Sequence, residues 1–190
     1  MKTIPNKLTI LRLILTPIFA FVFISNAISY EYRYCIAFVI FLLGMVTDLL
    51  DGIIARKYNC ITEFGIVADP IADKILLMTA IILLASIHRL HFYVVIILIL
   101  RDFLVSGIRI LLAKYTNAGE KSSKTLAPPI MGKAKTVVET ILVLYLLLYP
   151  EIKIVDYFLI TATLVLSLIS ATSLIKMGMP KIKHAYYDYE

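Results

Sequence analysis

Four aspartates and one arginine lie within a short stretch of a chain that is otherwise mostly apolar. Asp48 and Asp51 are three residues apart, and Asp69 and Asp73 are four apart, so on helices each pair would share one face. Arg56 stands between the two pairs. Carboxylates gathered at one place repel one another unless a cation accompanies them. Oxygen ligands of this kind suit Mg²⁺ or Mn²⁺, which proteins bind together with substrate phosphates.

Such a cluster suggests chemistry on a pyrophosphate or a phosphodiester. Two metal ions about 3.5–4 Å apart would neutralise the phosphates and steady the leaving oxygen. A carboxylate that is not fully used as a ligand would take the proton from an attacking hydroxyl.

Two helices must position these groups. If the link around Asn59 and Cys60 is a turn, the helices before and after it are antiparallel neighbours, and their carboxylates meet at one level. Small residues on both helices would let them, or a ligand, approach closely. These residues are Gly52, Ala55, Gly65 and Ala68.

The composition indicates that these helices lie in a membrane. The 190 residues are 61% hydrophobic, and the mean hydropathy is +0.90, whereas a soluble domain is nearer half apolar. We predict an all-α integral membrane protein, one domain over 1–190, with six transmembrane helices and a cytoplasm-facing active-site cavity. The six apolar segments are 8–28, 34–54, 66–87, 91–113, 136–150 and 155–177.

The lysines and arginines predict the orientation. Six spans would put Arg33, Arg89 and Lys153 on one side and the rest of the nineteen Lys and Arg residues on the other. By the positive-inside rule, both termini and the aspartates are cytoplasmic in a multi-pass protein of the cell membrane. Cys35 and Cys60 would then lie on opposite sides, which argues against a disulfide. The net charge of +6 suits an anionic leaflet or phosphorylated substrates, and equally topology alone.

The first segment also carries polar residues. Asn6, Thr9 and Arg12 fall on one helical face, as expected if this segment contributes to a site. The alternative is a cleaved signal peptide, because Ser25-Asn-Ala27 is a small-x-small sequence after an apolar run.

Further cations lie within the fourth segment and at the start of the fifth. Arg101 and Asp102 are adjacent and would point about 100° apart on a helix, so we expect them to be poor partners. Arg101 and Arg109 are eight residues apart and fall near one face, where a structural salt bridge to one of the aspartates is the alternative to a binding role. Lys133 and Lys135 would form either a phosphate clamp or a positive-inside anchor.

At these residues the chain resembles a known family. Asp-x-x-Asp-Gly-x-x-Ala-Arg, eight residues, then Gly-x-x-x-Asp-x-x-x-Asp is similar to the signature of the CDP-alcohol phosphotransferases, and all eight fixed positions are present from Asp48 to Asp73. Further motifs resemble the bacterial phosphatidylglycerophosphate synthase branch, which joins CDP-diacylglycerol to sn-glycerol 3-phosphate and releases CMP. These motifs are Asn6-x-x-Thr9-x-x-Arg12, Asp69-Pro-Ile-Ala-Asp73-Lys74, Arg101-x-x-x-x-Ser106-Gly-x-Arg109 and Gly132-Lys-x-Lys-Thr136.

The resemblance implies a role for each matching residue. Asp48, Asp51, Asp69 and Asp73 would bind two divalent metal ions, Mg²⁺ or Mn²⁺, and Asp73 would also be the general base. Gly52, Ala55, Arg56 and Thr62 would hold the CDP group, although the sequence alone favours a plain cap of the third helix for Thr62. The candidates for binding the acceptor's phosphate are Arg101, Arg109, Lys133 and Lys135. The residues that would hold these and the other ligand-binding side chains in place are Asn6, Thr9 and Ser106.

The resemblance also implies a homodimer of six-helix chains in contact with membrane lipids, and no nucleic acid partner. One departure is Asp102, where the branch leads us to expect glutamate.

Other functions remain as alternatives. A synthase of the same family with another acceptor (phosphatidylglycerol, inositol phosphate or serine) would share the catalytic half. An intramembrane prenyltransferase also uses Asp-x-x-x-Asp pairs, but it lacks the Gly-x-x-Ala-Arg element. A cation transporter would hold its carboxylates at mid-membrane and would avoid the neighbouring arginine. Release of CMP from CDP-diacylglycerol separates the first class from the other two.

Overall fold

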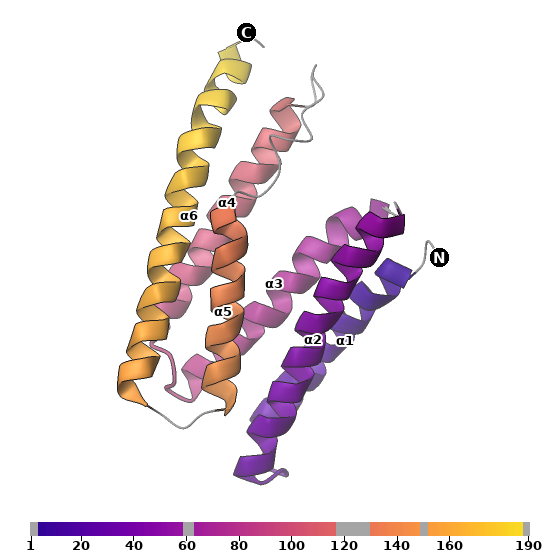
Figure 1. Cartoon of the computed structure of the whole chain (residues 1–190), viewed down its shortest axis with the longest axis vertical. Helices are drawn as coiled ribbons and strands as arrows, with labels where there is room; N and C mark the ends of the chain where they lie inside the picture. The colour runs from indigo at the N-terminus through magenta and orange to yellow at the C-terminus, as the bar shows by residue number, and fades with distance from the viewer. Residues whose placement is uncertain (1–3, 59–62, 117–129, 149–151, 188–190) are drawn as a thin grey trace. The chain divides into compact units, whose positions relative to one another are not determined.

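The computed structural model describes the backbone of residues 4–58, 63–116, 130–148 and 152–187, and its regular elements over these residues are all α-helices (Figure 1). Side chains are described for these residues apart from 4–8, 30–31, 51–58, 63–73, 109–116, 130–131, 133, 177 and 180–187. Six helices occur in this part of the chain. They are α1 (Ile4–Ile24), α2 (Tyr30–Tyr58), α3 (Glu63–Ser86), α4 (Phe92–Thr116), α5 (Ile130–Leu148) and α6 (Lys153–Tyr187).

The helices confirm the predicted all-α class, because each apolar segment overlaps one helix. Their ends differ from the prediction. α5 begins at Ile130 instead of 136, and α6 continues to Tyr187 instead of 177. Hydropathy marks only the apolar part of a helix, whereas lysine and methionine can extend the same helix beyond it.

Two of the described helices are long and apolar enough to cross a membrane. These spans are Tyr32–Leu50 in α2 and Lys153–Lys176 in α6, and shorter apolar stretches cover Thr9–Ile24 and Lys74–Ser86. Large apolar side chains such as Phe21, Leu49 and Phe158 are about two-thirds or more exposed. Together with its composition, this exposed apolar surface is typical of a membrane protein.

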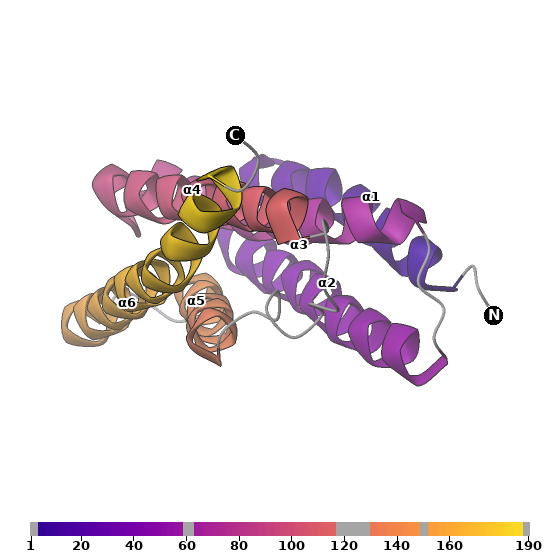
Figure 2. The same ribbon diagram turned by 90° about the horizontal axis from the view of Figure 1, so that it is seen from above.

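The chain divides into two compact units. The first is Met1–His91 with Val143–Ile152, and the second is Phe92–Leu142 with Lys153–Glu190. In the first unit, α1 packs against both α2 and α3 (Figure 2). Aromatic rings fill the contact between α1 and α2: the ring centroids of Phe19 and Phe41 are 5.9 Å apart, and Phe23 meets Tyr34 edge-on at 5.4 Å.

Arg33 stabilises the turn that joins α1 to α2. Its Nη1 donates to the carbonyl oxygen of Ser25 at 3.2 Å and to Oδ1 of Asn26 at 3.3 Å. The guanidinium also lies 5.5 Å from the ring centroid of Tyr34. The turn is therefore held by a residue from the first turn of the following helix.

α3 ends in a tight turn at His88. The backbone N–H of His88 donates to the carbonyl of Ala85, and that of Arg89 donates to the carbonyl of Leu84, each at 3.0 Å. His88 has a φ of 62°, the left-handed conformation that closes a helix of this Schellman type. His88 therefore has a structural role, in closing α3.

In the second unit, α4 packs against α6 (Figure 2). The buried positions of α6 follow a single stripe with spacings of three and four residues: Asp156, Ile160, Thr163, Ser167, Ser170 and Leu174. Small hydroxyl residues in the middle of this stripe allow close approach of the two helices and offer hydrogen-bond acceptors within the interface.

Candidate functional site

The signature aspartates are distributed over two packed helices of the first unit. Asp48 and Asp51 lie on α2, and Asp69 and Asp73 lie on α3. The side chain of Asp48 is described, and it is 38% exposed. Those of Asp51, Asp69 and Asp73 lie outside the described residues, so convergence of the four carboxylates stays a prediction.

A close contact between α2 and α3 lies beside two of these aspartates. A Cβ atom added at Gly44 would collide with Cδ2 of Leu76, so the leucine occupies the space that the glycine leaves. Asp48 follows Gly44 by a rise of about 6 Å along α2, and Asp73 precedes Leu76 by about 4.5 Å along α3. Because these consecutive helices run in opposite directions (Figure 1), the backbones of Asp48 and Asp73 lie at nearly the same level.

α1 supplies a buried cation to this region. Nη1 of Arg12 lies 3.1 Å from Oδ1 of Asp48, and the Arg12 side chain is 0% exposed. Thr9 is also fully buried. These two residues confirm that the polar face of the first helix points inward; the side chain of Asn6 lies outside the described residues.

The Arg12–Asp48 ion pair was not predicted. Helical spacing predicted an inward face for Arg12 but no partner, and a salt bridge to the aspartates was expected only from the arginines of α4. An arginine within a long apolar helix is itself the signal, because a charge in that setting needs a counter-ion.

The proposed CDP-binding residues stay untested by geometry. Gly52, Ala55 and Arg56 lie on the last turns of α2, where side chains are not described. Thr62 lies outside the described residues.

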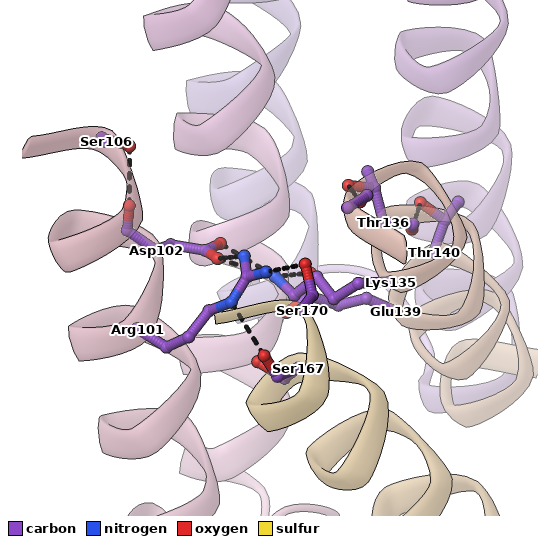
Figure 3. Close-up of polar contacts among 10 residues, drawn as sticks. Arg101, Asp102, Ser106, Lys135, Thr136, Glu139, Thr140, Ser167 and Ser170 are labelled. Atoms are coloured by element: carbon purple, nitrogen blue, oxygen red, sulfur yellow. Dashed lines mark hydrogen bonds and ion pairs between the residues drawn. The ribbon is translucent and has the colours of Figure 1, made fainter. Parts of the chain in front are cut away.

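A second polar cluster occurs in the other unit, where α4, α5 and α6 each contribute (Figure 3). Asp102 lies at its centre. Its Oδ1 accepts from Nη1 of Arg101 at 2.8 Å, and both of its carboxylate oxygens accept from Nζ of Lys135 at 2.9 Å. Lys135 also forms an ion pair with Glu139, one turn further along α5.

The remaining donors of Arg101 reach α6. Nε donates to the carbonyl oxygen of Ser167 at 3.1 Å, and Nη2 donates to Oγ of Ser170 at 2.6 Å. One guanidinium therefore connects the α4 carboxylate to two successive turns of α6.

The expectation that Arg101 and Asp102 are poor partners is wrong. The angle of about 100° between adjacent residues describes only the directions in which their side chains leave the helix. The arginine chain is long enough to bring its guanidinium back to the adjacent carboxylate, and Lys135 fixes that carboxylate from the other side.

The other predicted residues of this region are placed only in part. Ser106 donates its hydroxyl to the backbone oxygen of Asp102 at 2.6 Å, a local helix contact. Arg109 lies on α4 and Lys133 on α5, but their side chains lie outside the described residues. Glu139, which is 1% exposed, was missed; its position four residues after Lys135 was the available signal.

Comparison with known sequences decides the family. Residues 2–170 match the CDP-alcohol phosphatidyltransferase family. The chain belongs to this family. The match covers both units and every motif named above.

Several curated relatives support a narrower grouping within the CDP-alcohol phosphatidyltransferases. A protein of Bacillus subtilis (strain 168) is 34% identical over 158 residues, which cover 78% of each chain. One from Wigglesworthia glossinidia brevipalpis is 34% identical over 179 residues, or 91% of each chain. A Rickettsia felis protein is 40% identical over 113 residues, covering 59% of this chain and 60% of the relative. Each is named CDP-diacylglycerol–glycerol-3-phosphate 3-phosphatidyltransferase.

CDP-alcohol phosphatidyltransferases generally depend on divalent metal ions, and the residues of this chain fit such an ion. Carboxylate oxygens are the ligands that Mg²⁺ and Mn²⁺ prefer, and Asp48 presents a partly exposed carboxylate near the level of Asp73. Arg12 lies against Asp48, one of the four signature aspartates that the chain carries on α2 and α3. Its single positive charge leaves the proposed four-carboxylate set with net negative charge, which a divalent cation would compensate.

Proposed function

We infer that this chain transfers the phosphatidyl group of CDP-diacylglycerol to sn-glycerol 3-phosphate, giving phosphatidylglycerophosphate and CMP. The observation that carries this inference is the alignment with relatives of that name over 78% and 91% of both chains. The intact signature from Asp48 to Asp73 agrees with it. The protein is thus a transferase of phospholipid biosynthesis.

We propose that Asp48, Asp51, Asp69 and Asp73 hold two divalent ions, Mg²⁺ or Mn²⁺. When bound, these ions would neutralise the pyrophosphate and the developing charge on the departing CMP. Asp73 would accept the proton from the attacking hydroxyl of glycerol 3-phosphate. The new oxygen–phosphorus bond forms at the phosphate that carries diacylglycerol, and the bond from that phosphorus to the CMP oxygen breaks.

The residues proposed to bind the two substrates lie in different parts of the chain. Gly52, Ala55, Arg56 and Thr62 would hold the cytidine and its pyrophosphate. We propose that the cations of α4 and α5 serve the acceptor, by direct contact or by holding these helices in place, because a doubly charged phosphate needs positive partners that an uncharged acceptor does not. These cations are Arg101, Arg109, Lys133 and Lys135, with Asn6, Thr9 and Ser106 supporting the helices that carry the site.

We further propose that all six helices span the cell membrane, with both termini and the catalytic cavity on the cytoplasmic side, and that two copies of the chain form a homodimer. The distribution of lysine and arginine supports the orientation. The lipid tails would lie among membrane lipids, and the reacting phosphates would lie at the surface where soluble glycerol 3-phosphate arrives.

The decisive experiment is CMP release by purified protein from labelled CDP-diacylglycerol, with a panel of acceptors. We expect release with glycerol 3-phosphate only when Mg²⁺ or Mn²⁺ is present. Faster CMP release with phosphatidylglycerol, inositol phosphate or serine would mean that this compound is the acceptor, and the CMP-releasing reaction of the family would stand. Absence of CMP release with every acceptor would overturn the assignment.

A further inference from the structure

The cluster on α4, α5 and α6 contains two cations and two carboxylates in contact with one another. Arg101 and Lys135 contribute the positive charges, and Asp102 and Glu139 contribute the negative charges. The formal sum is zero, so the two cations already have counter-ions of their own. We call these four residues the neutral quartet.

Burial makes this balance important. The side chains of Lys135 and Glu139 are 2% and 1% exposed, and those of Arg101 and Asp102 are 10% and 12% exposed. A buried charge that loses its partner is costly, because neither water nor another ion replaces the lost contact. An acceptor phosphate bound directly by Arg101 and Lys135 would add two negative charges to a site that has no positive charge to spare.

The contacts of the quartet instead serve to hold helices. Lys135 binds α5 to the carboxylate on α4, and Arg101 binds α4 to Ser167 and Ser170 on α6. In Figure 3 these side chains point toward one another from the three helices. The same α4 and α5 carry the other two cations of the proposed acceptor site, Arg109 and Lys133.

We propose that Asp102 and Glu139 are positioning residues of the acceptor site, and that the four cations divide into two pairs. Arg101 and Lys135 are neutralised within the quartet and fix α4, α5 and α6 in register. Arg109 and Lys133 would then be the two cations of the proposed site left to contact the acceptor's phosphate. This proposal rests on the proposed function, since it presumes an acceptor that carries a phosphate.

A double-mutant cycle at Glu139 and Lys135 tests the proposal. Lys135→Gln leaves the cluster with a formal charge of minus one, and Glu139→Gln leaves it with plus one. The combined variant restores a sum of zero and keeps Arg101 and Asp102, which contact each other at 2.8 Å, as the remaining charges. The measurements are KM for glycerol 3-phosphate, KM for CDP-diacylglycerol, kcat, and the midpoint of thermal unfolding.

We expect each single variant to lower kcat/KM for glycerol 3-phosphate by about 10- to 100-fold, the scale of a misplaced binding group, with KM for CDP-diacylglycerol little changed. The combined variant should recover most of that loss, and Asp102→Glu, which keeps the charge, should stay near wild type. Asp156→Asn is the matched control, because it removes a buried carboxylate of α6 about 16 Å along the helix from Ser167; it should leave both KM values unchanged.

Two results would overturn the proposal. If Lys135 contacts the phosphate directly, the combined variant will be at least as poor as Lys135→Gln alone. If the quartet only stabilises the fold, the variants will lower the unfolding midpoint and leave KM for glycerol 3-phosphate unchanged. The acceptor panel with the wild-type protein tests the proposed function separately. If the protein uses another acceptor, the proposed function fails. The same mutant cycle, measured with that acceptor, then still distinguishes direct phosphate contact, positioning and a purely structural role.

Discussion

Asp73 is the residue on which the proposed chemistry depends most. We predict that Asp73→Asn lowers kcat by about 100- to 10,000-fold, the contribution of a positioned general base, because the amide cannot accept the hydroxyl proton. The protein should still fold and bind CDP-diacylglycerol, as measured by thermal unfolding and by binding of labelled lipid. Normal turnover in this variant would remove Asp73 as the base.

Arg12 offers a second test at the level of one residue. Lysine at this position keeps the charge but loses the planar guanidinium that contacts Asp48 at 3.1 Å. We predict that Arg12→Lys weakens Mn²⁺ binding about tenfold, as expected when a partner that orients a metal ligand is altered. Mn²⁺ binding to the protein without substrate is the measurement, by titration calorimetry or electron paramagnetic resonance.

The control for Arg12 is its neighbour one turn along the helix. Thr16 donates its hydroxyl to the backbone oxygen of Arg12 at 2.9 Å. Thr16→Ala removes that local contact and leaves the guanidinium in place, so Mn²⁺ affinity should stay at the wild-type value. Equal affinities in Arg12→Lys and wild type would show that Arg12 does not orient Asp48.

Among the helices, α2 and α3 approach each other closely at Gly44. We predict that Gly44→Ala destabilises the protein by about 1–3 kcal/mol, as overpacking commonly does, because the new methyl group collides with Leu76. Thermal unfolding in detergent measures the effect. Adding Leu76→Ala should recover part of it by removing the colliding atom.

The chain provides a matched glycine for this experiment. Gly107 is also helical, and a Cβ atom there would meet nothing within 4 Å. Gly107→Ala should therefore be neutral or stabilising by up to about 1 kcal/mol, since alanine favours a helix over glycine. A loss of stability as large as that of Gly44→Ala would mean that the close contact is not the cause.

The helices were predictable from the sequence to a much greater extent than their polar contacts. Runs of apolar residues predicted all six, and the inward face of Thr9 and Arg12 followed from helical spacing. The prediction that Arg101 and Asp102 do not pair was wrong, because flexible side chains can reach partners that the backbone directions do not suggest. Glu139 was missed because hydropathy treats it as an interruption of an apolar helix, whereas the structure pairs it with Lys135. A contact such as Arg12–Asp48 depends on tertiary packing, which periodicity alone does not specify.

For the whole molecule, the two native cysteines can test the predicted orientation. Cys35 is a free, exposed residue near the start of α2, and Cys60 follows α2 in the sequence. We predict that a membrane-impermeant maleimide labels Cys35 from outside intact cells in a Cys60→Ser variant. In a Cys35→Ser variant, Cys60 should react only after the membrane is permeabilised. The reverse pattern would place the aspartates on the outer side and contradict the cytoplasmic site.

The neutral quartet has a consequence for how the protein is made. Its opposite charges are neighbours within each helix: Arg101 is adjacent to Asp102 on α4, and Lys135 is one turn from Glu139 on α5. A lone arginine or lysine at the centre of an inserting segment disfavours insertion by about 2.5–3.5 kcal/mol. Under the proposed six-span topology each helix brings its own counter-ion, so α4 would enter the lipid before α5 has been translated. The contact between Lys135 and Asp102, which joins the two helices, would then form at a later step of assembly, after both helices have entered the bilayer.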